Sequence, residues 1–220
     1  FLRKNKYYPI RTYQKLEGDP MKAMTNVFTQ LAKEGEGAAL QMVARPARIG
    51  WVRKLRMEAQ RVNEGRPDEG PVMKTIGDML RPTKTPEQMQ AEQQRKAQRK
   101  LTPIEDDTIK QLEGKASKAL FETNIRLVAS ADSLERSQNI LQGLEVAFAQ
   151  FNDLNLNSFR TERSEGKSLK NTIFHFSFRS FDESKTAVLS AEEMTSIFHF
   201  PNVRIETPHI KVTKAREAAA

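Results

Sequence analysis

The stretch KALFETNIRLVASA, residues 118–131, is the clearest strand in the sequence and decides the fold class. Aromatic, aliphatic and β-branched residues such as Phe121, Ile125 and Val128 crowd this run, and such residues are enriched in strands. The helices predicted on both sides of it make the expected class α+β.

The helix before this strand begins at Thr102-Pro103-Ile104-Glu105, which combines a capping residue, a first-turn proline and a glutamate close behind. We expect it to end near Gly114. The helix after the strand is capped by Ser133, and apolar residues line it as far as Phe151.

The first part of the chain has the same predicted order of elements, a helix, a strand and a second helix. Asp19-Pro20 opens a helix over residues 21–33, the apolar run 39–44 is a strand, and residues 50–63 form a second helix. We therefore predict two small helix-strand-helix lobes, a pattern that suggests ferredoxin-like or related α/β layers. The lobes span residues 1–80 and 102–220, and residues 81–101 form a polar linker between them.

The C-terminal third contains further elements. Residues 156–162 are predicted as a strand, residues 173–181 form an aromatic cluster that fits either a strand or a helix, and Ser190 caps a short helix through Ile197. A short helix near 72–80 and an edge strand at 203–205 complete the expected elements.

The sequence offers no recognisable catalytic site, metal site or cofactor site. It contains no cysteine, and its three histidines have no partner at helical metal-ligand spacing. Gly166-Lys167-Ser168 matches the end of a P-loop, but Thr161 stands where the first glycine is needed, so a turn is the better interpretation. The acidic triplet 105–107 fits the first turn of a helix better than a metal site. We therefore expect no enzymatic activity and no cofactor for this segment.

The charge balance is compatible with an anionic partner, either nucleic acid or an anionic membrane leaflet, but many basic proteins bind neither. The chain carries 36 basic and 28 acidic residues, for a net charge of +8. A solvated helix face is the simpler interpretation of the basic run that surrounds Trp51, and a phosphate-binding face is the functional one. The candidate nucleic-acid-binding residues are Arg45, Arg48, Arg53, Lys54, Arg56 and Arg61.

Several stretches together resemble a known family. They are YPIRTY at 8–13 with Asp19-Pro20, GEGAALQ at 35–41 before Arg45-Pro46, and TNIRLVASA at 123–131, with LSAEEM at 189–194 and TPHI at 207–210 in addition. This set resembles the region before the motor domain of large bacterial ATPases related to type IV secretion coupling proteins and other hexameric DNA translocases.

The resemblance implies a non-catalytic accessory region of a membrane-attached ATPase, at the cytoplasmic face of the inner membrane. Such a region would position the motor and mediate subunit contacts during conjugation-like DNA or protein transfer. Its implied partners are the downstream ATPase domain of the same chain, further copies of the chain, DNA, and the membrane through a segment outside this chain. The start at Phe1 fits the expectation of an excised segment. The alternative is a stand-alone basic nucleic-acid-binding module.

Overall fold

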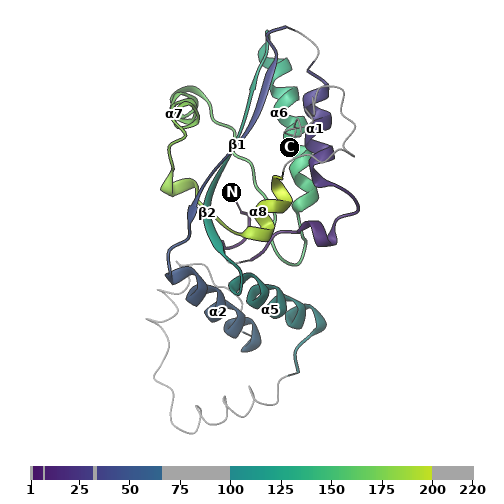
Figure 1. Cartoon of the computed structure of the whole chain (residues 1–220), viewed down its shortest axis with the longest axis vertical. Helices are drawn as coiled ribbons and strands as arrows, with labels where there is room; N and C mark the ends of the chain where they lie inside the picture. Colours follow the sequence, from purple (N-terminus) through teal and green to yellow (C-terminus); the bar gives the residue numbers. More distant parts are fainter. Residues whose placement is uncertain (1, 7, 32–33, 66–99, 200–220) are drawn as a thin grey trace, which may run out of the picture. The chain divides into compact units, whose positions relative to one another are not determined.

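The computed structural model describes residues 2–6, 8–31, 34–65 and 100–199. These residues contain six α-helices and a three-stranded antiparallel sheet, which confirms the α+β class (Figure 1). The chain divides into two compact units: the first takes in residues 1–47 and 119–220, and the second takes in residues 48–118.

The sheet of the first unit joins strands that lie far apart in the sequence. Its order is β1 (Gly37–Pro46), β2 (Leu120–Ser130) and β3 (Ala187–Ser190), and both pairings are antiparallel. Leu40 pairs with Leu127, so apolar side chains of both long strands lie on the same face. This face is the one that the helices cover.

Three helices cover the core face of the sheet: α1 (Pro20–Thr29), α6 (Leu134–Phe148) and α8 (Ala191–Ile197) (Figure 1). Asp19 and Ser133 cap α1 and α6 through their side chains, as predicted. The buried core residues between helices and sheet are Ile10, Met21, Met24, Ala147, Phe148, Phe151, Ala187, Leu189 and Ile197.

The N-terminal segment is held against this core by a buried carboxylate. Glu193 lies in the first turn of α8, and its Oε1 accepts a hydrogen bond from the backbone N–H of Ile10 at 2.9 Å. Its Oε2 accepts from the backbone N–H of Ser190 at 2.7 Å, and the Ser190 hydroxyl accepts from Glu193 in return. Past Ile10, the short 3-10 helix η1 (Tyr13–Lys15) follows, and Tyr13 donates its N–H to Ser196.

The described part of the second unit is a pair of helices. α2 (Gly50–Asn63) and α5 (Pro103–Ala116) pack side by side and bury small or aliphatic residues such as Leu55 and Leu112. The bounds of α2 are those predicted, and the capping box at Thr102 is also confirmed.

The remaining segments of the first unit differ from the predictions. The predicted strand at 156–162 is wrong, because only Phe159 makes an isolated bridge, to Leu2. The aromatic cluster lies in and after helix α7 (Gly166–Ser177), and the short strand β3 was not anticipated. Two 3-10 turns, η2 (Ala149–Phe151) and η3 (Glu183–Lys185), complete the fold. The predicted helix at 72–80 and strand at 203–205 lie outside the described residues.

The division into units differs from the predicted lobes at 1–80 and 102–220. Pairing of β1 with β2 places both predicted lobe strands in one sheet, and α2 and α5 instead belong to the unit inserted between them in the sequence. Hydrogen bonding between β1 and β2 satisfies backbone groups that two separate single strands would leave without partners. The predicted linker at 81–101 is described only at its last two residues.

Candidate nucleic-acid interface

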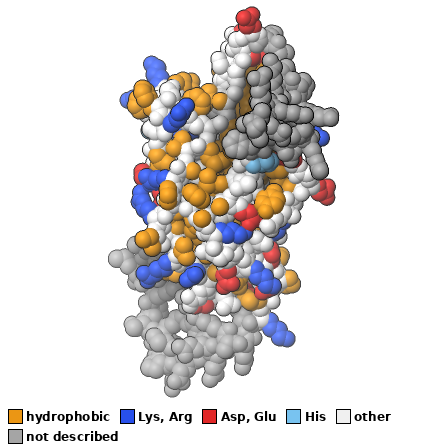
Figure 2. Space-filling model, in the orientation of Figure 1, with side chains coloured by type: hydrophobic (Ala, Val, Ile, Leu, Met, Phe, Trp, Pro, Cys, Tyr) orange, Lys and Arg blue, Asp and Glu red, His pale blue; other side chains and the backbone are white. Residues whose placement is uncertain are grey.

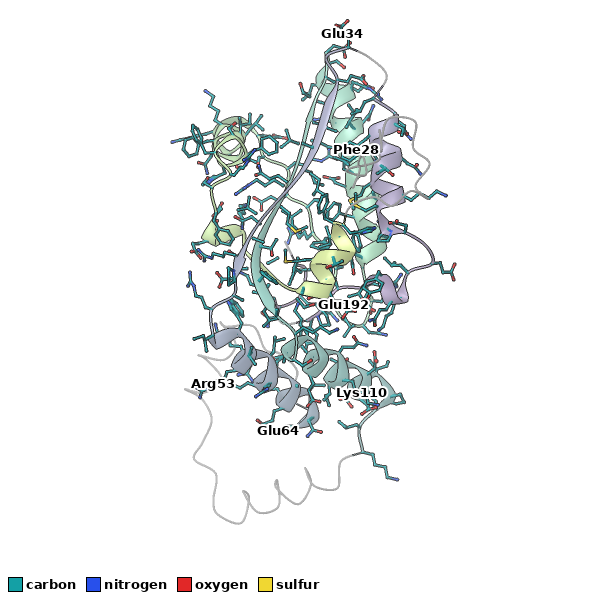
Figure 3. All side chains as sticks on the ribbon, in the orientation of Figure 1. Phe28, Glu34, Arg53, Glu64, Lys110 and Glu192 are labelled. Atoms are coloured by element: carbon teal, nitrogen blue, oxygen red, sulfur yellow. The ribbon has the colours of Figure 1, made fainter. Side chains whose placement is uncertain are left out.

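The exposed face of α2 carries several basic side chains, interspersed with Met57 and Gln60. At 100° per residue, Leu55, Glu58 and Ala59 fall on one side of the helix, and all three are buried. The opposite side carries exposed Arg53 and Arg56. Figure 3 shows Arg53 on the side of α2 that faces away from α5. The helix is therefore amphipathic, with its cationic side available to solvent.

The cations of α2 differ in their surroundings. Arg53 and Arg56 have no ion-pair partner among the residues that the structure describes. Lys54 places its Nζ 4.4 Å from the centre of the Trp51 ring. Arg61 lies 3.5 Å from the carboxylate of Glu58. Arg53 and Arg56 are consequently the cations best placed to meet an external anion.

The face lacks a competing carboxylate along most of its length. From Gly50 to Met57 the sequence contains no acidic residue, and Glu58 is directed to the buried side. Glu64 follows the last turn and accepts a hydrogen bond from Gln60 at 3.0 Å. The first two turns of α2 therefore contribute only positive charges of their own.

Arg45 belongs to a different environment from the other predicted residues. It lies on β1 in the first unit, and its guanidinium donates to Glu122 at 2.8 and 2.6 Å and to Glu183 at 2.6 Å. The same guanidinium lies 4.0 Å from the centre of the Phe181 ring. Hydrogen bonds to Glu122 and Glu183 raise the pKa of Arg45, so its charge is matched by two carboxylates.

Arg45 is expected to stabilise the sheet. An Arg45→Ala substitution removes the cation beside the buried Glu122 carboxylate and should lower the Tm of the chain by about 5 °C. Circular dichroism melting measures this change. Arg53→Ala is the matched control and should shift the Tm by less than about 1 °C, since that side chain is exposed. Equal effects of the two substitutions would contradict a structural role for Arg45.

A polar network that no sequence pattern predicts lies on the outer face of the sheet. Arg126 donates to Gln41 at 2.8 Å and to the carbonyl of Ser180 at 2.6 Å, and Asn124 donates to the carbonyl of Asp182. Burial lowers the pKa of Arg126, and the charge of Asp182 opposes that shift. Burial raises the pKa of Asp182, but hydrogen bonds from Ser184 outweigh it, and the net pKa lies below its ordinary value. The network fixes the segment after α7 onto the sheet.

The other motifs of the sequence have structural roles here. Gly166 has a φ of 54° and begins α7, with irregular chain before it, so Lys167 and Ser168 lie in a helix rather than in the predicted turn. Two residues of the acidic triplet, Glu105 and Asp106, lie in the first turn of α5, and Asp106 pairs with Lys110 at 2.6 Å. His209 lies outside the described residues.

The histidines and carboxylates of the described ranges form no metal-binding cluster. His175 shares a hydrogen bond of 2.6 Å with the Ser180 hydroxyl, and His199 lies 3.1 Å from Asp19. Within the same described ranges, no helix combines the length and apolar character needed to cross a membrane.

Comparison with known proteins places the chain in a family. Searches among curated proteins and among solved structures gave no match. A family model described as a domain of unknown function, DUF8128, matches residues 1–213 of the 220. Since the match spans nearly the whole chain, this protein belongs to the DUF8128 family.

Proposed function

We propose that this chain is a non-catalytic accessory region of a membrane-attached ATPase for conjugation-like transfer, and that it contacts DNA through α2. In this role it positions the motor domain, mediates contacts between subunits and guides the nucleic acid. The ATPase chemistry belongs to the motor domain rather than to this region.

The first support is the resemblance carried by several separate stretches. The run at 123–131 coincides with most of β2, and Asp19-Pro20 forms the capped start of α1. The run at 189–194 coincides with the end of β3 and the start of α8, where Glu193 makes its buried hydrogen bonds. The stretches that carry the resemblance thus include central elements of the fold. Proteins that share a fold are expected to share sequence features in such elements.

The observation that carries the DNA contact is the basic face of α2. Lys and Arg side chains that lie along one helix face can neutralise successive phosphates and release the counterions condensed on them. Arg53 and Arg56 have no competing ion pair among the described residues, so a phosphate would not have to displace a carboxylate from them. The flanking Lys54 and Arg61 extend the same face.

Binding to DNA is expected to fall steeply with salt. If Arg53, Lys54, Arg56 and Arg61 each neutralise one phosphate, the slope of log affinity against log salt is about −3 to −4. The affinity for a duplex oligonucleotide should then fall roughly hundredfold between about 50 and 200 mM salt. Fluorescence anisotropy with a labelled duplex and a labelled single strand measures this. Affinity that is independent of salt would exclude a phosphate-binding face.

The positioning role has a separate test. The chain and the downstream ATPase domain of its own reading frame can be purified separately and mixed in analytical ultracentrifugation. We expect either self-association of the chain or a complex with the motor. A chain that stays monomeric and fails to bind its motor would overturn the accessory role, whatever its affinity for DNA.

A stand-alone basic nucleic-acid-binding module is the second candidate, because the α2 face supports it equally. The reading frame on both sides of the chain separates the two candidates. A Walker motif downstream favours the accessory region, whereas a stop codon soon after residue 220 favours the stand-alone module.

A further inference from the structure

Helix α7 is rich in apolar residues but buries none of them fully. Leu169 and Ile173 are about half exposed, Phe174 is 54% exposed, and Phe178 just after the helix is 70% exposed. Figure 2 shows hydrophobic side chains gathered over α7, with Lys and Arg side chains at their edge. Contiguous exposed apolar patches on soluble domains commonly mark interaction sites.

The orientation of α7 is fixed by its inner side. The carbonyl of Phe176 accepts a hydrogen bond from the Gln41 side chain of β1 at 2.9 Å. The hydroxyls of Ser164 and Thr172 share a hydrogen bond of 2.9 Å, and His175 bonds to Ser180. Figure 1 shows α7 across the sheet from α1 and α6. The apolar side chains are therefore presented outward by a helix that is anchored to the sheet.

The same outer face is cationic. Lys167 and Lys170 are exposed on α7, Arg179 is exposed just after it, and no acidic residue occurs between Gly166 and Phe181. By helical position, Lys170 lies between Ile173 and Phe174. A surface helix that interleaves aromatic and aliphatic residues with lysines is typical of helices that lie in the headgroup region of a bilayer.

The composition of the face favours lipid over nucleic acid or protein. Phe174 and Phe178 pack against each other, with ring centroids 4.7 Å apart and planes tilted by 41°, so a ring face of each is occupied rather than open to a base. Leu169 has no π-face for stacking. Lysine is depleted from the cores of protein interfaces, yet Lys170 stands in the middle of this one. Lysines at a bilayer surface instead keep their ammonium groups in the headgroup layer.

We propose that the exposed face of α7, formed by Leu169, Ile173, Phe174 and Phe178 with Lys167 and Lys170, is a docking surface for an anionic lipid bilayer. The apolar side chains enter the boundary between headgroups and acyl chains, and the lysines pair with lipid phosphates or carboxylates. This contact is made by the chain itself and does not depend on a membrane segment outside it. It also does not depend on DNA binding by α2.

The test is co-sedimentation of the full chain with phosphatidylcholine vesicles and with vesicles that also contain phosphatidylserine. We expect binding to the anionic vesicles and little to the neutral ones. Phe174→Ser/Phe178→Ser should weaken it about thirtyfold, because two partly exposed phenylalanines no longer enter the bilayer. Lys167→Glu/Lys170→Glu should weaken it by at least about tenfold.

Matched controls distinguish binding by this face of α7 from nonspecific hydrophobic or electrostatic binding by other parts of the chain. Leu154→Ser removes an apolar side chain that is 95% exposed elsewhere in the same unit, and Lys15→Glu/Lys22→Glu reverses two exposed lysines, on η1 and α1. Both should bind anionic vesicles like the unmodified chain. Phe174→Ser/Phe178→Ser should also leave DNA affinity unchanged, so failure of this proposal is distinguishable from failure of the α2 proposal.

Insertion of the α7 side chains into the bilayer can be measured separately from vesicle binding. A Phe174→Trp variant places an indole on the face, and brominated acyl chains in anionic vesicles should quench its fluorescence. Absence of vesicle binding, or binding that ignores the phenylalanine substitutions, would overturn the proposal. So would a self-associating chain that becomes monomeric on Phe174→Ser/Phe178→Ser, since the face would then be an interface between copies of the chain.

Discussion

Glu193→Ala should lower the free energy of unfolding of the chain by roughly 3–4 kcal/mol, because it removes a charged acceptor from two backbone N–H groups. Glu193 is only 1% exposed. Its two carboxylate oxygens accept hydrogen bonds from the backbone N–H groups of Ile10 at 2.9 Å and Ser190 at 2.7 Å. Alanine leaves both donors without that partner in a site from which water is excluded.

The loss should begin at the N-terminal segment. Ile10 is part of the core, and the next residue, Arg11, donates its N–H to the carbonyl of Phe151 at 2.9 Å. Hydrogen exchange of the Ile10 and Arg11 amides should therefore accelerate in Glu193→Ala more than exchange in the centre of β2. Urea denaturation followed by circular dichroism gives the global change.

Glu135→Ala is the matched control for Glu193→Ala. Glu135 also lies in the first turn of a helix, α6, but it is exposed, so its removal costs only the interaction with the helix dipole, about 0.5 kcal/mol. Equal losses for the two substitutions would mean that the dipole, and not the buried hydrogen bonds, accounts for the effect. An unchanged unfolding free energy in Glu193→Ala would mean that the Glu193 carboxylate does not hold the N-terminal segment against the core.

Local sequence signals were sufficient for most helices. Asp19-Pro20, Thr102-Pro103 and Ser133 each carry a capping residue that the structure confirms, and these signals act within one helical turn. The capping box at Ser190 is equally local and is also confirmed. Strands β1 and β2 were likewise found as elements, because their composition is β-rich.

Strand partners could not be predicted in the same way. The pairing of Met42 with Ile125 joins residues separated by α2, α5 and the chain between them, and no local pattern encodes such a contact. The short strand β3 is buried at all four positions, so it lacks the alternation that marks a half-buried strand. The predicted lobes consequently separated two strands that the sheet joins.

The spacing of the phenylalanines in the aromatic cluster fits both the two-residue repeat of a strand and the 3.6-residue repeat of a helix. Phe174, Phe176 and Phe178 alternate along the chain, which fits a strand. The same residues are compatible with a helix, in which Phe174 and Phe178 lie one turn apart and Phe176 points elsewhere. The structure has the helix, and the ring contact between Phe174 and Phe178 is the i, i+4 contact expected of it.

The surroundings of a candidate residue could be predicted where they depend on its own helix. They could not be predicted where they depend on residues that are distant in the sequence. Spacing alone placed Arg53 and Arg56 on the polar side of α2. The partners of Arg45 are 77 and 138 residues away, so its ion pairs with Glu122 and Glu183 were invisible in the sequence. This difference decides which arginines to change in a test of DNA binding.

Arg53→Glu/Arg56→Glu should weaken binding to duplex DNA by at least about a hundredfold at low salt. Each substitution removes a cation that has no ion pair among the described residues and places a carboxylate in its position, where it repels phosphate. Arg53→Gln/Arg56→Gln removes the cations without adding repulsion, and it should reduce the salt slope by about 2. Fluorescence anisotropy over a range of salt concentrations measures both effects.

The control must change net charge equally without touching α2. Lys15→Glu/Lys22→Glu reverses two exposed lysines of the first unit, on η1 and α1, and lowers the net charge of the chain by the same amount. If the whole-molecule field drives binding, both double variants should lose the same affinity. If the α2 face makes the contact, the control should stay within about threefold of the unmodified chain, because neither lysine then contacts a bound phosphate. Equal loss in the two variants would therefore reduce the α2 interface to a general electrostatic attraction.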